Sequence, residues 1–165
     1  MRVPIRKPGK YTHQKPDPYL TLAKFNELKN KLERMKKSQP AMIIEVKRLA
    51  EMGDFSENAA YQIAKGRLRG LNQRMLDIED HLKTAIIIGD EKNCDTVQLG
   101  CDVIVEIGGK KKQYKILGSS ETNPEGNVIS HNSPIGSALM GHRVGEVVKV
   151  QLVKKVVEYR VVGIE

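Results

Sequence analysis

Between residues 25 and 49, apolar side chains recur at alternating spacings of three and four residues. This spacing places them on one face of an α-helix and is typical of the seam of a coiled coil. The seam positions are Phe25, Leu28, Leu32, Met35, Gln39, Met42, Val46 and Leu49. A second series with the same spacing consists of Tyr61, Ala64, Leu68, Leu71, Met75, Ile78, Leu82 and Ala85. The pattern therefore predicts two long amphipathic helices.

The two series also fit each other as antiparallel partners. Counted outward from the segment that joins them, every position of the first has a counterpart in the second, beginning with Leu49 and Tyr61. We therefore expect a helical hairpin over residues 20–89 that reverses near residue 55. Its arm should be on the order of 40 Å long, at ~1.5 Å rise per residue. Pro40 should remove one hydrogen bond from the first helix and bend it.

After residue 88 the apolar pattern changes to a two-residue alternation, which is typical of half-buried strands. Gly108 and Gly109 signal a hairpin turn that continues into three lysines. A short helix is expected to begin at Pro134 and to end before Gly141. Strands are predicted over residues 103–107, 113–117, 128–130, 147–153 and 156–162. We therefore predict an α+β protein, in which an antiparallel coiled-coil hairpin precedes a small, mostly antiparallel β domain over residues 90–165.

Residues 1–19 form a third region, rich in proline and basic side chains, whose composition favours an extended arm. This arm is either a passive tail or an added contact with a partner. The whole chain carries 28 Lys and Arg against 20 Asp and Glu, a net charge of +8. This balance favours polyanionic partners, with nucleic acid first and an acidic protein or membrane surface second.

The chain lacks the marks of a membrane or secreted protein. No stretch approaches ~18 uninterrupted apolar residues, and the N-terminus lacks the apolar region of a signal peptide. We therefore expect a cytoplasmic protein. Cys94 and Cys101 match neither a C-x-x-C motif nor a four-ligand zinc pattern, so both are expected to be reduced. His131 and His142 match no zinc spacing either.

The segment GDFSEN, residues 53–58, puts two carboxylates at the turn of a basic hairpin, since residues 21–76 hold twelve Lys and Arg against six acids. Asp54 and Glu57 have the spacing of a capping box, in which each side chain binds a backbone N–H at a helix start. They also suit Mg²⁺, which takes one or two carboxylates and fills its other positions with water or phosphate oxygens. The residues alone leave both interpretations open.

Two motifs identify a resemblance. GDFSENAAY, residues 53–61, lies between two heptad helices, and ISHNSPIGSALMG, residues 129–141, follows in the second domain. Val144-Gly145-Glu146 and Val157-Glu158-Tyr159 continue the second motif. These segments resemble the bacterial transcript-cleavage factors GreA and GreB over roughly residues 20–165. Features of both subtypes are present, so the subtype stays open.

The resemblance implies a transcription elongation factor with an FKBP-like C-terminal domain. This domain would dock at the rim of the secondary channel of bacterial RNA polymerase, and the coiled coil would reach the active centre. There Asp54 and Glu57 would help to hold a Mg²⁺ ion shared with the polymerase and would position the water that cuts backtracked RNA at its 3′ end. The protein would be a monomeric accessory factor that rescues arrested complexes, with no cofactor or enzyme activity of its own.

The resemblance also assigns roles to further residues. The tip would be shaped by Gly53, Phe55, Ser56 and Asn58. A basic face that contacts RNA would consist of Lys47, Arg48, Lys65, Arg67 and Arg69, although these could equally form a solvated helix surface. Docking to the polymerase would involve Ser133, Pro134, Ile135 and Gly136. Two rival functions remain: a Gre-like inhibitor that blocks the same channel, and a general nucleic-acid-binding coiled coil.

Overall fold

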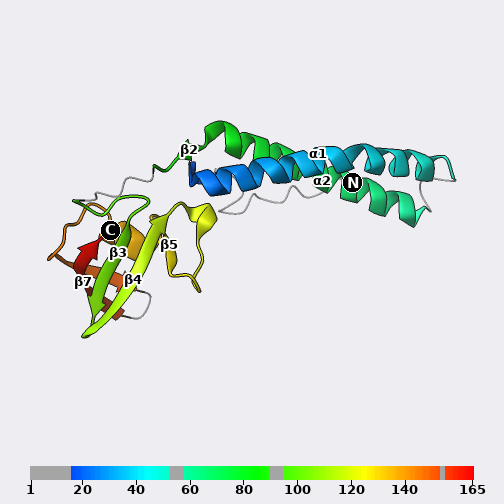
Figure 1. The fold of residues 1–165 in the computed structure, drawn as a ribbon. Coiled ribbons are helices and arrows are strands. Elements are labelled where there is room, and N and C mark those ends of the chain that lie inside the picture. Colours follow the sequence, from blue (N-terminus) through cyan, green and yellow to red (C-terminus); the bar gives the residue numbers. More distant parts are fainter. Residues whose placement is uncertain (1–15, 53–57, 90–94, 153–154) are drawn as a thin grey trace, which may run out of the picture.

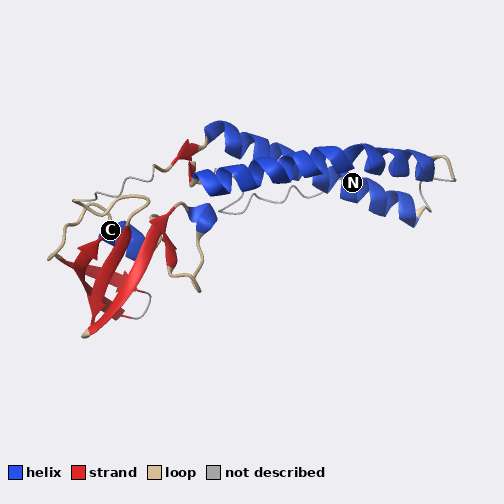
Figure 2. Cartoon of the chain, in the orientation of Figure 1, coloured by secondary structure: helices blue, strands red, loops and turns tan. Residues whose placement is uncertain are grey.

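The protein consists of a long two-helix arm and a small sheet domain at one end of it (Figures 1 and 2). The computed structural model describes residues 16–52, 58–89, 95–152 and 155–165. Within these residues, helix α1 spans Leu22–Ala50 and helix α2 spans Ala59–Thr84. The predicted α+β class, with a helical hairpin before a β domain, is confirmed.

The seam predicted from the apolar spacing is the interface between the two helices. Leu32, Ala64 and Met75 are buried, the other seam side chains are half-buried, and most remaining positions of the arm are exposed. The arm therefore has a narrow line of contact and no enclosed core of its own. This is the geometry expected when apolar residues recur every 3.5 positions on each helix.

A polar layer interrupts the seam near Pro40. Gln39 Nε2 donates a hydrogen bond to Asn72 Oδ1 across the two helices, with 2.8 Å between the atoms. Helix α1 continues through Pro40 even though this residue has no N–H to donate. Contacts with α2 on both sides of the proline hold the two halves of α1 in one helix.

The sheet domain contains five strands in the order β5-β4-β3-β7-β6. All neighbours are antiparallel except β4 and β5, which run parallel. The strands are β3 Asp102–Ile107, β4 Lys110–Leu117, β5 Val128–Ser130, β6 Val147–Leu152 and β7 Lys155–Ile164. Helix α3, Pro134–Leu139, contributes Leu139 to the core. The buried side chains of this core are Val97, Val103, Val105, Ile116, Leu139, Val148, Val150, Tyr159 and Val161.

Strand β4 begins three residues earlier than the sequence suggested. Gly108 and Gly109 alone form the turn, with φ angles of 55° and 79° that glycine adopts without a Cβ clash. Pairing can therefore resume at once, and Lys110 lies opposite Ile107 in the ladder. The three lysines that the sequence placed in the turn are exposed residues of the strand.

Three short elements were not predicted. Strands β1, Tyr19–Leu20, and β2, Ile86–Ile87, form a parallel pair where the arm meets the sheet domain. A single 3₁₀ turn, η1, spans Ser119–Glu121. Elements of two or three residues show no periodicity, so the apolar pattern cannot indicate them. Leu20 is nevertheless fully buried, which makes this junction a packed part of the fold.

The expectation that both cysteines are reduced is wrong for Cys101. This residue is disulfide-bonded, and Cys94 lies outside the described residues. The chain turns immediately before Cys101, whose N–H donates to the Gln98 carbonyl at 3.3 Å. The prediction rested on the spacing of the cysteines along the sequence. A disulfide depends instead on the distance between two cysteines in space, which a turn of the chain can shorten.

Among the described helices, none combines the length and the apolar character that a membrane crossing requires.

Gly136 tests the packing of α3 on the sheet domain. A Cβ at this buried position would collide with the Ser130 carbonyl oxygen, which is backbone and cannot swing aside. We expect Gly136→Ala to lower the free energy of unfolding by about 1–3 kcal/mol. In Gly66→Ala, where the added Cβ would meet no atom within 4 Å outside its own stretch of helix, the same change should raise the free energy of unfolding by roughly 0.5–1 kcal/mol. Urea unfolding followed by circular dichroism measures both, and equal stability of the two variants would contradict this account.

Candidate functional site

The far end of the arm is closed by Asn58. Its Oδ1 accepts a hydrogen bond from the Tyr61 N–H at 3.0 Å and thereby caps the start of α2. Its Nδ2 donates to the Leu49 carbonyl in the last turn of α1 at 2.8 Å, and that carbonyl also accepts from backbone N–H groups at the helix end. A single side chain therefore caps α2 and links it to the end of α1.

The predicted acid pair, Asp54 and Glu57, lies in the segment 53–57, outside the described residues, together with Gly53, Phe55 and Ser56. Their roles stay predictions. The donors themselves suit Mg²⁺, since carboxylate oxygens are its preferred protein ligands. Two carboxylates supply only part of an octahedral shell, and no cluster of three or more His, Cys, Asp or Glu within the described part of the chain could hold a metal. A Mg²⁺ ion held by this pair would take its remaining ligands from water, phosphate oxygens or a partner.

The five predicted basic residues are all exposed and lie in the half of the arm nearest Asn58. Lys65 Nζ lies 5.5 Å from the centre of the Tyr61 ring, a cation–π distance. Within the described residues, none of the five forms an ion pair. Their charges are therefore available to an external polyanion.

These five residues do not share one face. Lys65 and Arg69 are four positions apart on α2 and therefore lie on the same side of the helix. Arg67 is two positions from each, which turns it by about 200° to the opposite side. Basic side chains therefore lie on more than one side of the arm. Lys65 and Arg69 are the pair that can contact the phosphates of one nucleic-acid strand together.

The predicted docking segment has a structural role of its own. Ser133 Oγ accepts from the Gly136 N–H at 3.0 Å, capping α3, and donates to the Ser130 carbonyl at 2.6 Å. Ile135 packs against the core, and Gly136 is buried against Ser130. Pro134 is the exposed member of the four. The fold alone thus accounts for Ser133, Ile135 and Gly136, and a partner reaches Pro134 most easily.

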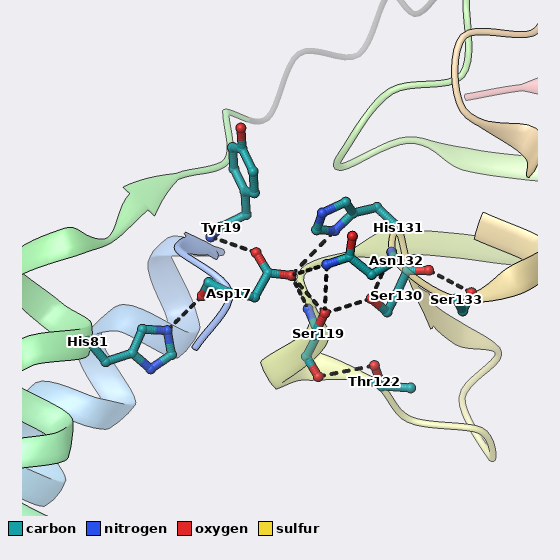
Figure 3. A network of polar contacts seen from close by, with 9 residues as sticks. All are labelled: Asp17, Tyr19, His81, Ser119, Thr122, Ser130, His131, Asn132 and Ser133. Carbon is teal, nitrogen blue, oxygen red and sulfur yellow. Dashed lines mark hydrogen bonds and ion pairs between the residues drawn. The ribbon is translucent and has the colours of Figure 1, made fainter. Parts of the chain in front are cut away.

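A polar cluster that the apolar pattern and the motifs did not predict lies at the junction of the arm and the sheet domain (Figure 3). This junction cluster consists of Asp17, Ser119, His131 and Asn132. Its members come from three segments up to 115 positions apart, so no local motif connects them. The one available signal was an isolated acid, Asp17, beside an otherwise basic N-terminal region.

Family profiles cover most of the chain. The profile described as "Transcription elongation factor, N-terminal" matches residues 18–87, and "Transcription elongation factor, GreA/GreB, C-term" matches residues 91–165. The transcription elongation factors GreA of Thermoanaerobacter pseudethanolicus and Caldanaerobacter subterraneus are each 36% identical over 149 residues, which is 88% of this chain and 95% of theirs. A crystal structure of GreA factor homolog 1 of Thermus thermophilus is 29% identical, covers 90% of this chain and 99% of its own, and has a TM-score of 0.42.

Asn58 provides a test of how the arm is closed. Asn58→Ala removes both the cap of α2 and the link to Leu49, and should cost about 0.5–2 kcal/mol. It should also speed hydrogen exchange at the Tyr61 amide, measured by NMR. Asn58→Asp is the matched control, because it keeps the acceptor for Tyr61 and loses only the donor to Leu49. Equal exchange in the alanine variant and the wild type would refute the cap.

Proposed function

Because this chain belongs to the GreA/GreB family of transcription elongation factors, we propose that it binds bacterial RNA polymerase through the secondary channel. There it stimulates the polymerase's cleavage of backtracked nascent RNA and so rescues arrested complexes. The observation that carries this proposal is the architecture of the arm. Two helices with a thin seam carry Met52 and Asn58 to the far end of the arm, and in the chain these two residues flank the segment that contains Asp54 and Glu57.

The length of the arm suits it to reach a site far from the sheet domain. The 26 residues of α2 span about 39 Å at ~1.5 Å per residue. A hairpin this long would be unnecessary if its only task were to cover the sheet domain, which has its own core. We therefore assign the sheet domain to docking outside the channel and the arm to delivery of the acids inside it.

Asp54 and Glu57 would act as ligands that complete a site in the partner. A Mg²⁺ ion bound there would activate the attacking water and stabilise the leaving oxygen of the phosphodiester. The two carboxylates would orient toward the ion and the water because the arm holds them at a fixed depth. The protein would therefore be an accessory factor with no resident cofactor, and the polymerase would carry out the cleavage.

The unpaired basic side chains near the tip would hold the RNA. Lys65 and Arg69 lie on one side of α2 and can contact successive phosphates near the 3′ end without reading the bases. Such contacts would retain the backtracked strand beside the acids. The function also implies a cytoplasmic protein that acts as a monomer, since one arm would fill one channel.

The acids are tested by RNA cleavage in stalled, backtracked bacterial elongation complexes. Wild-type protein should release 3′ fragments, whereas Asp54→Asn and Glu57→Gln should bind equally but cleave at least about 10-fold more slowly, since loss of even a residue that supports a metal ligand typically costs that much. Glu51→Gln is the matched control, because Glu51 is an exposed acid at the neighbouring helix end. If the wild type binds and releases nothing above background, an inhibitor of the same channel becomes the better assignment.

The basic side chains are tested by the salt dependence of the same reaction. Each phosphate contact to a single strand contributes about 0.7 to the slope of log affinity against log salt. The affinity can be taken from the protein concentration that gives half-maximal cleavage. In the double variant Lys65→Ala/Arg69→Ala, the magnitude of the slope of log affinity against log salt should therefore be smaller than in the wild type by about 1.4. Lys83→Ala is the control, since Lys83 lies near the sheet domain and pairs with Asp80. An unchanged slope in the double variant would assign these residues to a solvated surface, and tight binding to free RNA would favour a general nucleic-acid-binding protein.

A further inference from the structure

Asp17 lies between the arm and the sheet domain and contacts both (Figure 3). Its Oδ2 accepts hydrogen bonds from the Ser119 N–H at 2.7 Å and from the Ser119 hydroxyl at 2.8 Å. Asn132 Nδ2 lies 3.5 Å from the same oxygen. The Asp17 side chain is only 4% exposed. Its carboxylate is therefore a fixed part of the sheet-domain surface.

The backbone of the same residue contacts the arm. His81 Nε2, on α2, donates to the Asp17 carbonyl oxygen at 2.8 Å. His81 is itself buried near the end of that helix. Asp17 thus connects α2 with the sheet domain through one residue, without an intervening loop.

A second attachment lies four residues further along. Glu121 accepts hydrogen bonds from the Thr21 N–H and from the Thr21 hydroxyl, both at 2.7 Å. The Thr21 hydroxyl also accepts from the Lys24 N–H and so caps α1. The 3₁₀ turn η1 therefore binds Asp17 through its first residue and Thr21 through its last. Two points along an extended segment fix a direction, whereas one point would allow rotation.

The segment between the two attachments is also held closely. The Tyr19 carbonyl oxygen lies so near Gly118 that a Cβ there would collide with it. The Tyr19 ring stands edge-on to His131, with 5.5 Å between ring centres and 87° between planes. Only glycine at position 118 permits this approach, which means that the junction tolerates little displacement.

The carboxylate of Asp17 is stable as an anion. Burial alone would raise its pKa, but hydrogen bonds from the Ser119 backbone and hydroxyl and from the Tyr19 N–H, together with electrostatic attraction to the nearby His131, hold the pKa below its ordinary value. A lowered pKa means that the stabilisation is present above the ordinary carboxyl pKa and is lost only as the pH falls through the lowered one. Hydrogen bonds to an ionised acceptor are stronger than those between neutral groups.

We infer that Asp17 is a positioning residue that sets the direction of the arm relative to the sheet domain. Because the arm is long, a small rotation at the junction becomes a large displacement at the tip. A change of about 10° at the junction moves a point 40 Å away by roughly 7 Å, given the ~1.5 Å rise of the helices. Misplacement of a reacting group by about 1 Å can cost a hundredfold in rate. Only this last step, from direction to cleavage, rests on the proposed function.

The direction itself is tested by pulsed electron resonance on the full chain. Spin labels carried by a non-natural amino acid at Lys37 and Glu125, both exposed, report the distance from arm to sheet domain without adding cysteines. The wild type should give one narrow distribution. Asp17→Ala and Gly118→Ala should each broaden or shift it, the first by removing the anchor and the second by forcing Tyr19 away. The control is Asp80→Asn, because Asp80 is an exposed acid whose ion pair is with Lys83 on the same helix, and this variant should leave the distribution unchanged.

Cleavage kinetics provide the second measurement. At saturating protein, Asp17→Ala and Gly118→Ala should cleave at least about tenfold more slowly, while the half-saturating concentration changes less than threefold. Asp17→Asn keeps an acceptor for Ser119 and should restore part of the rate. Unchanged distance distributions in both variants, or a defect confined to half-saturation, would overturn the inference. If wild-type protein stimulates no cleavage, the proposed function fails, and the spin-label distances still decide the role of Asp17.

Discussion

The seam between α1 and α2 is the interaction on which the rest of the molecule depends. Only Leu32, Ala64 and Met75 are buried along it, because two helices cannot enclose a side chain as a sheet and helix can. The arm therefore gains its stability from a long row of small contributions instead of a core. That design leaves almost the whole helix surface free for charged side chains, and it fixes the antiparallel register that brings the two helix ends to Asn58.

Sequence periodicity predicted the elements whose side chains repeat a pattern. The heptad spacing found both helices and their pairing, and the two-residue alternation found all five strands of the sheet domain. Strand β4 was placed too late because lysines look like turn residues, whereas a two-glycine turn lets pairing resume immediately. The disulfide at Cys101 and the pair β1–β2 depend on distances that close only after folding, and no local pattern contains them.

For the candidate site, too, some features could be predicted from the sequence and others became evident only from the structure. Motif resemblance predicts Asp54 and Glu57 as site residues, and their acidity within a basic arm is the chemical reason for that prediction. Resemblance also grouped five basic residues as one face, but the helical period separates Arg67 from Lys65 and Arg69. In the predicted docking segment, the cap and the close packing of α3 account for Ser133 and Gly136, so these residues need no partner to explain them, and Pro134 is the exposed member.

The position of the tip relative to the sheet domain depends on three connections in series, and the least rigid of them limits its accuracy. These connections are the cap at Asn58, the seam past Pro40 and the junction at Asp17. Apolar contact suits the seam, because sliding is prevented by the interlocking of many side chains along its length. The junction is short, and apolar contact over two or three residues would permit rotation. Directional hydrogen bonds from Ser119 and Glu121 restrict both angle and distance. The polar character of the junction is therefore what a short, angle-fixing connection requires.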